Sequence, residues 1–339
     1  NVLTADEVII NGNNVEVVSD HSFNVGASII AGNLTLTSGA AKNGNSPAAY
    51  GITDAGDVSV AGDFSATTTA YNGAIIMGTL EVNGTIALKT DGTGNATIVN
   101  DDDINFEAST VGGALTATAT TNDITDTGVL RITGAATFTA AGGQSIILDS
   151  NNTFGDGVED DSTDPNVTFA SAGNLKNVTI KDSDEFDLRA LTLAKVSSAG
   201  GNLTVTAGGT LTDGGALVIP GTTTITATGQ VVTLDHTSND FETITFGSST
   251  NAVSSVVVVD TDDIDIGASK SAGDFTVTAG DNVTDSDIVT VGGDLSVTTN
   301  AGNGTIDMRT LAVAAGDNTI TLTTHNTGDN NSHATVVNA

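Results

Sequence analysis

A long internal repeat constrains this sequence more than any other feature. The segment at 258–269 aligns without gaps to the segment at 17–28, and further copies centre on Ile104 and Phe186. With Phe23 and Ile264, these four anchor positions are 81, 82 and 78 residues apart. A fixed period of this kind is typical of repeat architectures. We therefore predict one continuous domain over 1–339, with tandem copies at approximately 17–98, 99–180, 181–258 and 259–339 after a partial copy at 1–16.

The elements that follow each anchor recur in a fixed order. A strand led by glycine comes first, then a Thr-Asp pair, then a second strand led by glycine; the pairs lie at 53–54, 125–126, 212–213 and 284–285. Within a copy the spacing is shorter: Leu203 to Thr223 and Phe275 to Leu295 are each 20 residues. In the first copy Leu34 to Phe64 is 30 residues, and we expect the extra residues to form an excursion loop around 42–50. These spacings predict coils of about 20 residues, about four to each copy.

The residue pattern inside these segments indicates β-strands. Leu or Val alternates with Thr, which places one side chain in a core and the next in water. Equivalent strands one coil apart have the same phase, so they can stack parallel and in register. The sequence thus predicts an all-β fold, a single-stranded parallel β-helix (β-solenoid), right-handed, whose core holds six phenylalanines: Phe23, Phe64, Phe106, Phe138, Phe186 and Phe275.

Composition narrows the classes of function. The chain has 9 Lys plus Arg against 41 Asp plus Glu, a formal net charge of −32. Nucleic-acid binding needs clustered cations, so this balance excludes it, and no stretch is apolar enough for membrane insertion. There is no cysteine, which is compatible with an extracellular location because a long repetitive core does not depend on disulfides. The chain starts at Asn rather than Met, and we interpret it as a processed or excerpted segment.

Acidic residues cluster at the anchors and suggest calcium. Ca²⁺ takes carboxylate and carbonyl oxygens, and neighbouring acids favour its binding. The candidate ligands are Asp260, Asp262, Asp263 and Asp265 in the fourth copy, and Asp182, Asp184, Glu185 and Asp187 in the third. The alternative is a set of solvated acidic turns that keep the surface soluble. Ca²⁺ is the sole cofactor that the sequence suggests.

No constellation of residues indicates catalysis, and we expect that the protein is not an enzyme. The four His residues show no metal-ligand spacing, and paired carboxylates recur with the repeat rather than marking one site. Two alternatives remain open beside a structural role. One is a β-helix that binds or cleaves polysaccharide. The other is an ice-binding solenoid, because outward Thr204 and Thr206 are expected to stack on Thr224 and Thr226.

Both ends of the sequence have the phase of an anchor. The segment at 3–10 matches 259–266, and 336–339 stops at the phase of 258–261. Solenoid edges carry unpaired backbone groups, so we expect head-to-tail stacking into a homopolymer or continuation in a longer chain.

A resemblance to a known family supports an extracellular role. The block Gly-Asn-Leu-Thr-Val-Thr-Ala-Gly-Gly-Thr-Leu-Thr-Asp at 201–213 resembles the repeats of bacterial surface adhesins of the filamentous-haemagglutinin type, and Asn239-Asp240-Phe241 with 258–267 extends the similarity. Similar repeats occur in fibrous surface-layer proteins. The resemblance implies a right-handed parallel β-helix exported to the cell surface. We therefore expect a shaft or filament segment of an adhesin or surface layer, whose partners are a host or matrix glycan or a surface receptor.

Overall fold

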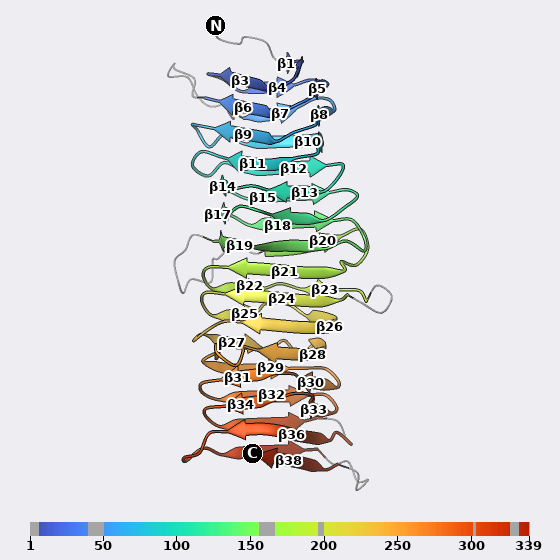
Figure 1. Ribbon diagram of the computed structural model, residues 1–339, viewed down its shortest axis with the longest axis vertical. Helices are drawn as coiled ribbons and strands as arrows, with labels where there is room; N and C mark the ends of the chain where they lie inside the picture. Colours follow the sequence, from blue (N-terminus) through green and yellow to red (C-terminus); the bar gives the residue numbers. More distant parts are fainter. Residues whose placement is uncertain are drawn as a thin grey trace. The chain divides into compact units, whose positions relative to one another are not determined.

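The computed structural model is a parallel β-solenoid. It describes residues 7–39, 51–155, 167–195, 200–300, 303–325 and 332–338, so the predicted loop at 42–50 lies outside the described residues. These ranges contain strands and turns but no helix, and thus no helix that could span a membrane. The chain forms two compact units, Asn1–Gly173 (unit 1) and Asn174–Ala339 (unit 2), each built of stacked turns (Figure 1).

Each turn of unit 1 contributes strands to two parallel sheets that enclose the core. Sheet A of unit 1 contains β1 (Glu7–Val8), β2 (Asn11–Gly12), β4 (Phe23–Val25), β5 (Ser28–Ile30), β7 (Ile52–Asp54), β8 (Val58–Val60), β10 (Ile75–Val82), β12 (Ala96–Asn100), β15 (Leu115–Ala119), β18 (Ala136–Ala140) and β20 (Val167–Ser171). Sheet B of unit 1 contains β3 (Val15–Ser19), β6 (Leu34–Ser38), β9 (Phe64–Thr68), β11 (Thr85–Lys89), β13 (Ile104–Phe106), β14 (Ser109–Val111), β16 (Ile124–Asp126), β17 (Leu130–Ile132) and β19 (Ile146–Phe154).

Unit 2 repeats this arrangement. Its sheet A contains β22 (Phe186–Leu188), β25 (Leu211–Asp213), β27 (Val231–Leu234), β29 (Ser255–Val259), β32 (Phe275–Ala279), β35 (Leu295–Thr299) and β37 (Ile320–Thr324). Its sheet B contains β21 (Asn177–Asp182), β23 (Leu191–Thr192), β24 (Asn202–Ala207), β26 (Leu217–Thr226), β28 (Asp240–Phe246), β30 (Ile264–Ile266), β31 (Ser269–Ser271), β33 (Val283–Asp285), β34 (Val289–Val291), β36 (Ile306–Val313) and β38 (Ala334–Asn338).

The register between neighbouring turns agrees with the spacing read from the sequence. Leu203 pairs with Thr223, Phe275 with Leu295, and Leu34 with Phe64, all in parallel ladders. The predicted threonine stacks are also present, since Thr204 pairs with Thr224. The prediction of a parallel solenoid is therefore confirmed, including the pairing across the longer first-copy spacing.

The core is a column of apolar side chains from the inward positions of the strands. All six phenylalanines that the alternation predicted as core residues are buried, and Phe64, Phe106, Phe138 and Phe275 have no exposed surface. Rings from different turns touch edge to face, as in the pairs Phe106–Phe138 and Phe246–Phe275, with centroids 6.3 and 5.5 Å apart. Such contacts add to the free energy gained by burying the rings.

The number of turns in a copy differs from the prediction. In unit 1 the anchor strand β4 lies in sheet A, stacked on β7, whereas the next anchor strand, β13, lies in sheet B, stacked on β16. In unit 2 the anchors β22 and β30 show the same exchange. A copy therefore spans about three and a half turns of roughly 22 residues, not four turns of about 20.

The longer turn has a structural cause. One half of a turn is a single straight strand such as β6, and the other half bends into two short strands such as β4 and β5. The bend requires extra residues between the short strands. Since each copy holds an odd number of half-turns, equivalent segments of successive copies within a unit face opposite sheets.

Candidate functional site

The Thr-Asp pairs join each turn to the next. The carboxylate of Asp54 accepts hydrogen bonds from the backbone N–H groups of Gly78 and Thr79, at 2.9 and 2.7 Å. The carboxylate of Asp285 accepts from the N–H groups of Arg309 and Thr310, both at 2.8 Å. Asp126 and Asp213 accept two backbone N–H groups of the following turn in the same way. The repeated aspartate is therefore a structural clamp in all four copies.

Burial and a partner asparagine distinguish the clamps of the second and third copies. Desolvation raises the pKa of Asp126 and of Asp213, and hydrogen bonds from Asn152 and Asn239 oppose that increase. Asn152 Nδ2 donates to Asp126 Oδ2 at 2.7 Å, while its Oδ1 accepts from the N–H of Leu130 at 2.7 Å. Nothing in the sequence marks these asparagines, because the residues they contact are a full turn away.

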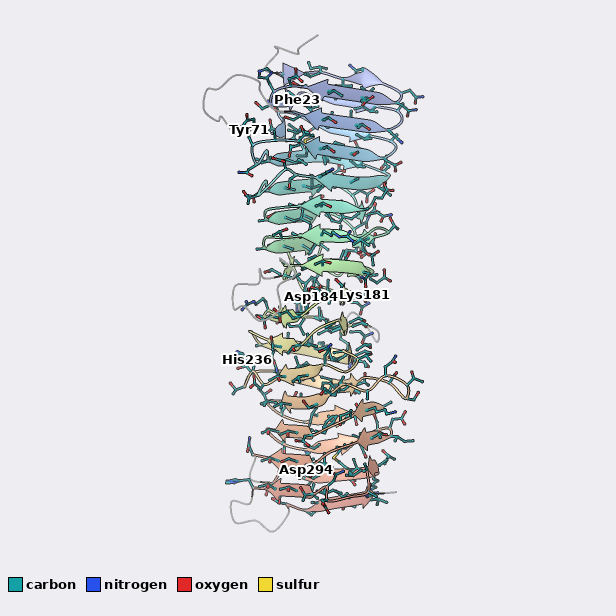
Figure 2. All side chains as sticks on the ribbon, turned by 90° about the vertical axis from the view of Figure 1, so that its left-hand side faces the viewer. Phe23, Tyr71, Lys181, Asp184, His236 and Asp294 are labelled. Atoms are coloured by element: carbon teal, nitrogen blue, oxygen red, sulfur yellow. The ribbon has the colours of Figure 1, made fainter. Side chains whose placement is uncertain are left out.

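A second series of polar side chains links corresponding corners of successive turns. Asn33 Oδ1 accepts the N–H of Asp63 at 3.0 Å, and Asp63 Oδ1 accepts the N–H of Thr85 at 3.0 Å. In unit 2, Asp274 Oδ1 accepts the N–H of Asp294, which is labelled in Figure 2, at 2.9 Å. The hydrogen bonds from Thr85 lower the pKa of Asp63, because they stabilise its ionised form. The acidic turns thus contribute to the stacking of turns as well as to solubility.

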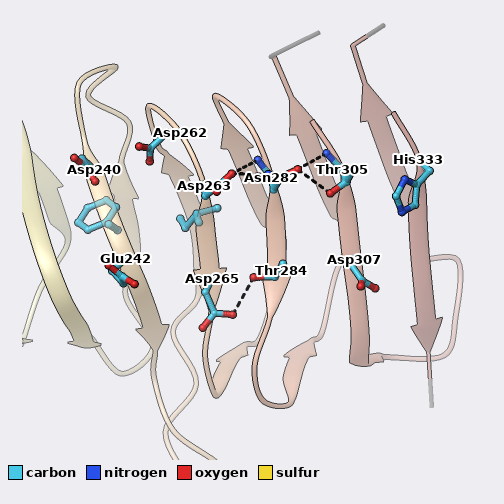
Figure 3. A pocket seen from close by; sticks show the side chains of 12 residues that line it. Asp240, Glu242, Asp262, Asp263, Asp265, Asn282, Thr284, Thr305, Asp307 and His333 are labelled. Carbon is cyan, nitrogen blue, oxygen red and sulfur yellow. Dashed lines mark hydrogen bonds between the residues drawn. The ribbon is translucent and has the colours of Figure 1, made fainter. Parts of the chain in front are cut away.

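An open groove on sheet B of unit 2 gathers most of the remaining acids. It has a volume of about 570 Å³ and crosses β28, β30, β33 and β36 (Figure 3). Its lining includes six carboxylates, with Asn282, Thr284, Thr305 and His333 beside them: Asp240, Glu242, Asp262, Asp263, Asp265 and Asp307. Burial, then the charges of Asp262 and Glu242, raise the pKa of Asp240. The groove therefore has a strongly negative potential.

Three of the predicted calcium ligands of the fourth copy line this groove. Asp263 Oδ1 accepts from the N–H and from the side-chain amide of Asn282, at 2.8 and 2.7 Å. Asp265 accepts from the hydroxyls of Thr284 and Ser286, at 3.2 and 2.6 Å. Asp262 is exposed. These carboxylates occupy successive positions along the turn and its strand, and two of them bind groups of the next turn.

Asp260 lies apart from the groove, in the corner that ends β29. It is 3% exposed, and its two oxygens accept the N–H groups of Phe241 and Asp262 at 2.7 and 2.9 Å. Burial, as the largest cause, raises its pKa to about 7. The same corner in unit 1 holds Asn100, which accepts the N–H of Val82 and donates to two carbonyl groups. Asp260 is thus placed to complete the backbone hydrogen bonding of a corner.

The third-copy candidates show a similar division. Asp182 is 1% exposed, and its Oδ1 accepts the N–H of Asp184 at 3.2 Å. Asp187 accepts the hydroxyl of Thr212 at 2.9 Å and contacts Arg189 at 3.0 Å, and Glu185 is half-buried. Across the parts of the chain that the structure describes, no three acidic or imidazole side chains converge as metal ligands. Calcium binding remains a prediction from the sequence.

Comparisons with known proteins support the repeat and give no activity. A family model described as repeats of unknown function (DUF5649) matches residues 93–160 and 166–246. These segments cover most of the second and third predicted copies. No curated protein and no solved structure matches the chain.

Proposed function

We propose that this chain is an extracellular structural protein, a shaft segment of a surface filament, surface layer or adhesin similar to the filamentous-haemagglutinin type. The observation that carries the proposal is the use made of its polar side chains. Clamps such as Asp54 and corner residues such as Asn33 bind the backbone of the neighbouring turn, and they recur with the repeat. A site for one substrate is typically a single, non-repeating constellation.

The proposed assembly extends the solenoid. Turns that repeat one register can stack on further turns, from a second copy or from the same polypeptide, because the strands at a solenoid edge present a row of backbone donors and acceptors. Head-to-tail contacts of this kind propagate rather than close. The high negative charge keeps such a shaft soluble and limits non-specific aggregation.

Electron microscopy and surface labelling test this proposal. Antibody-gold labelling of intact cells should mark the exterior, and purified material should form extended rods or fibres. Label confined to the cell interior would contradict the proposed location, and compact particles without fibres would contradict the shaft. Adding a calcium chelator tests the predicted ion: fibres that loosen support calcium at the acidic anchors, and unchanged fibres count against it.

The groove of unit 2 supports a second candidate function, carbohydrate binding. Carboxylate, amide and hydroxyl groups such as Glu242, Asn282 and Thr305 are suitable partners for sugar hydroxyls, and the groove is open along several turns. A glycan array should show binding that Glu242→Gln weakens and Asp317→Asn, an exposed charge outside the groove, leaves unchanged. An array with no bound glycan, or equal losses in both variants, would remove this candidate.

A further inference from the structure

Sheet A of unit 2 presents an outer surface without charge. The outward positions of β27, β29, β32, β35 and β37 hold only Thr, Ser and Val, and we call this set the charge-free face: Val231, Thr233, Ser255, Val257, Val259, Thr276, Thr278, Ser296, Thr298, Thr321 and Thr323. These strands pair in register, so the side chains form continuous columns; one column runs from Thr276 through Ser296 to Thr321. The face is a regular surface of mostly β-branched side chains.

The other sheet of the same unit contrasts with this face. Outward positions of sheet B carry both acids and cations, among them Lys181, Asp240, Glu242, Asp265, Lys270, Asp307 and Arg309. The acidic groove lies on this sheet. Charge is therefore unevenly divided between the two sheets, although Thr-rich strands occur in both.

Unit 1 shows the same division independently. The outward positions of its strands β12, β15, β18 and β20 are uncharged: Thr97, Val99, Thr116, Thr118, Thr137, Thr139, Thr168 and Ala170. The outward positions of its sheet B include Glu16, Lys89, Arg131 and Asp149. A charge-free sheet A in both units is unexpected for a chain with a net charge of −32.

This distribution determines where two copies of the chain can approach. Elsewhere, carboxylates of two copies would repel each other and would lose their hydration on contact. At the charge-free face no ionised group needs to be desolvated, and β-branched side chains of two flat sheets can interdigitate. Parallel sheets are, moreover, usually covered on both faces.

We propose that the charge-free face of unit 2 packs laterally against the same face of a second copy of the chain. The contact is isologous, with one surface patch used by both partners. It is distinct from end-to-end stacking of turns, and it does not depend on the cellular location of the protein. Side-by-side pairing of this kind thickens a shaft, whereas edge stacking lengthens it.

The salt dependence of association has a definite sign in this arrangement. Long-range repulsion between two strongly acidic copies opposes the contact, and added salt screens it over a Debye length of about 10 Å at 0.1 M. Association should therefore strengthen as the salt concentration rises. A contact made by ion pairs would weaken under the same change.

Analytical ultracentrifugation and small-angle X-ray scattering of the full chain test the proposal. The wild type should form pairs with an increased cross-section, favoured by salt. The double variant Thr278→Asp with Thr298→Asp places two charges at paired positions of the face and should raise the dissociation constant at least about tenfold. The control, Thr204→Asp with Thr224→Asp, places the same charges at paired outward positions of sheet B and should leave it unchanged.

Three results would overturn the proposal. The wild type could sediment as single copies at every protein and salt concentration, or the two double variants could weaken association equally, or particles could grow in length with a constant cross-section. A fourth result would assign the face to another partner: single copies that shape growing ice crystals, with this activity lost only in the Thr278 and Thr298 variant. Circular dichroism confirms that both variants fold. Surface labelling of cells tests the proposed function separately, so either idea can fail alone.

Discussion

Replacing Thr223 by valine should stabilise the protein. Thr223 occupies an inward position of β26, between Leu203 and Ile244 of the neighbouring turns, and has no exposed surface. Its hydroxyl oxygen is buried and has no hydrogen-bond partner within the described part of the chain. Valine has nearly the same shape but carries a methyl group at this position. The substitution therefore removes an unsatisfied polar group without changing the packing.

The magnitude follows from the cost of burying an unpaired hydroxyl group. Mutational data place that cost at about 1–3 kcal/mol, and we expect Thr223→Val to raise the free energy of unfolding by about 1–2 kcal/mol. With a urea m-value of about 3 kcal/mol/M, the unfolding midpoint should rise by about 0.5 M. Urea titration followed by circular dichroism measures this shift, and an unchanged m-value shows that stability alone has changed.

A neighbouring threonine is the matched control. Thr224 is on the same strand but faces outward, pairing with Thr204 and Thr245. Thr224→Val should therefore change the free energy of unfolding by less than about 0.5 kcal/mol. If Thr223→Val lowered the midpoint, or if both variants shifted it equally, the reasoning from the buried hydroxyl group would be refuted.

Three further substitutions probe the turns, each measured by urea unfolding. Gly112→Ala should destabilise by about 3 kcal/mol or more, because its Cβ atom would lie 1.6 Å from the carbonyl oxygen of Gly92, whereas Gly229→Ala, with φ of +72° in open space, should cost about 1–2 kcal/mol; equal costs would contradict the close approach. Asp126→Ala should destabilise by about 2–4 kcal/mol, because it leaves three donors of the next turn unpaired, and a loss below 0.5 kcal/mol, no more than an ordinary surface substitution costs, would be inconsistent with a clamp. Burial raises the pKa of Asp260 to about 7, so its ionised form is disfavoured in the folded state and stability falls as the pH rises from about 4 to about 7. Asp260→Asn should therefore stabilise by up to about 4 kcal/mol at pH 8 and by less at pH 5, and a variant with the wild-type pH dependence would show that Asp260 does not titrate in this range.

The candidate site was only partly predictable from the sequence. The acidic anchors were visible as a repeat, and Asp262, Asp263 and Asp265 do line the groove of unit 2. Asp307 and His333, which complete the lining, come from later turns, and no local pattern connects them to the anchor. The structural use of the Thr-Asp pairs was hidden for the same reason, because the N–H groups that Asp54 binds are 24 and 25 residues away.

The sequence by itself determined the strands, their inward and outward faces and the register between turns. These properties depend on alternation at period 2 and on spacings such as Leu203 to Thr223, which are local or nearly local in the chain. Only the tertiary structure decided that a copy spans about three and a half turns, because the turn length depends on how sharply the paired short strands bend around the core. That odd half-turn brings equivalent segments of successive copies to opposite sheets, and the division of charge between the sheets becomes visible only when outward residues from many turns are brought side by side.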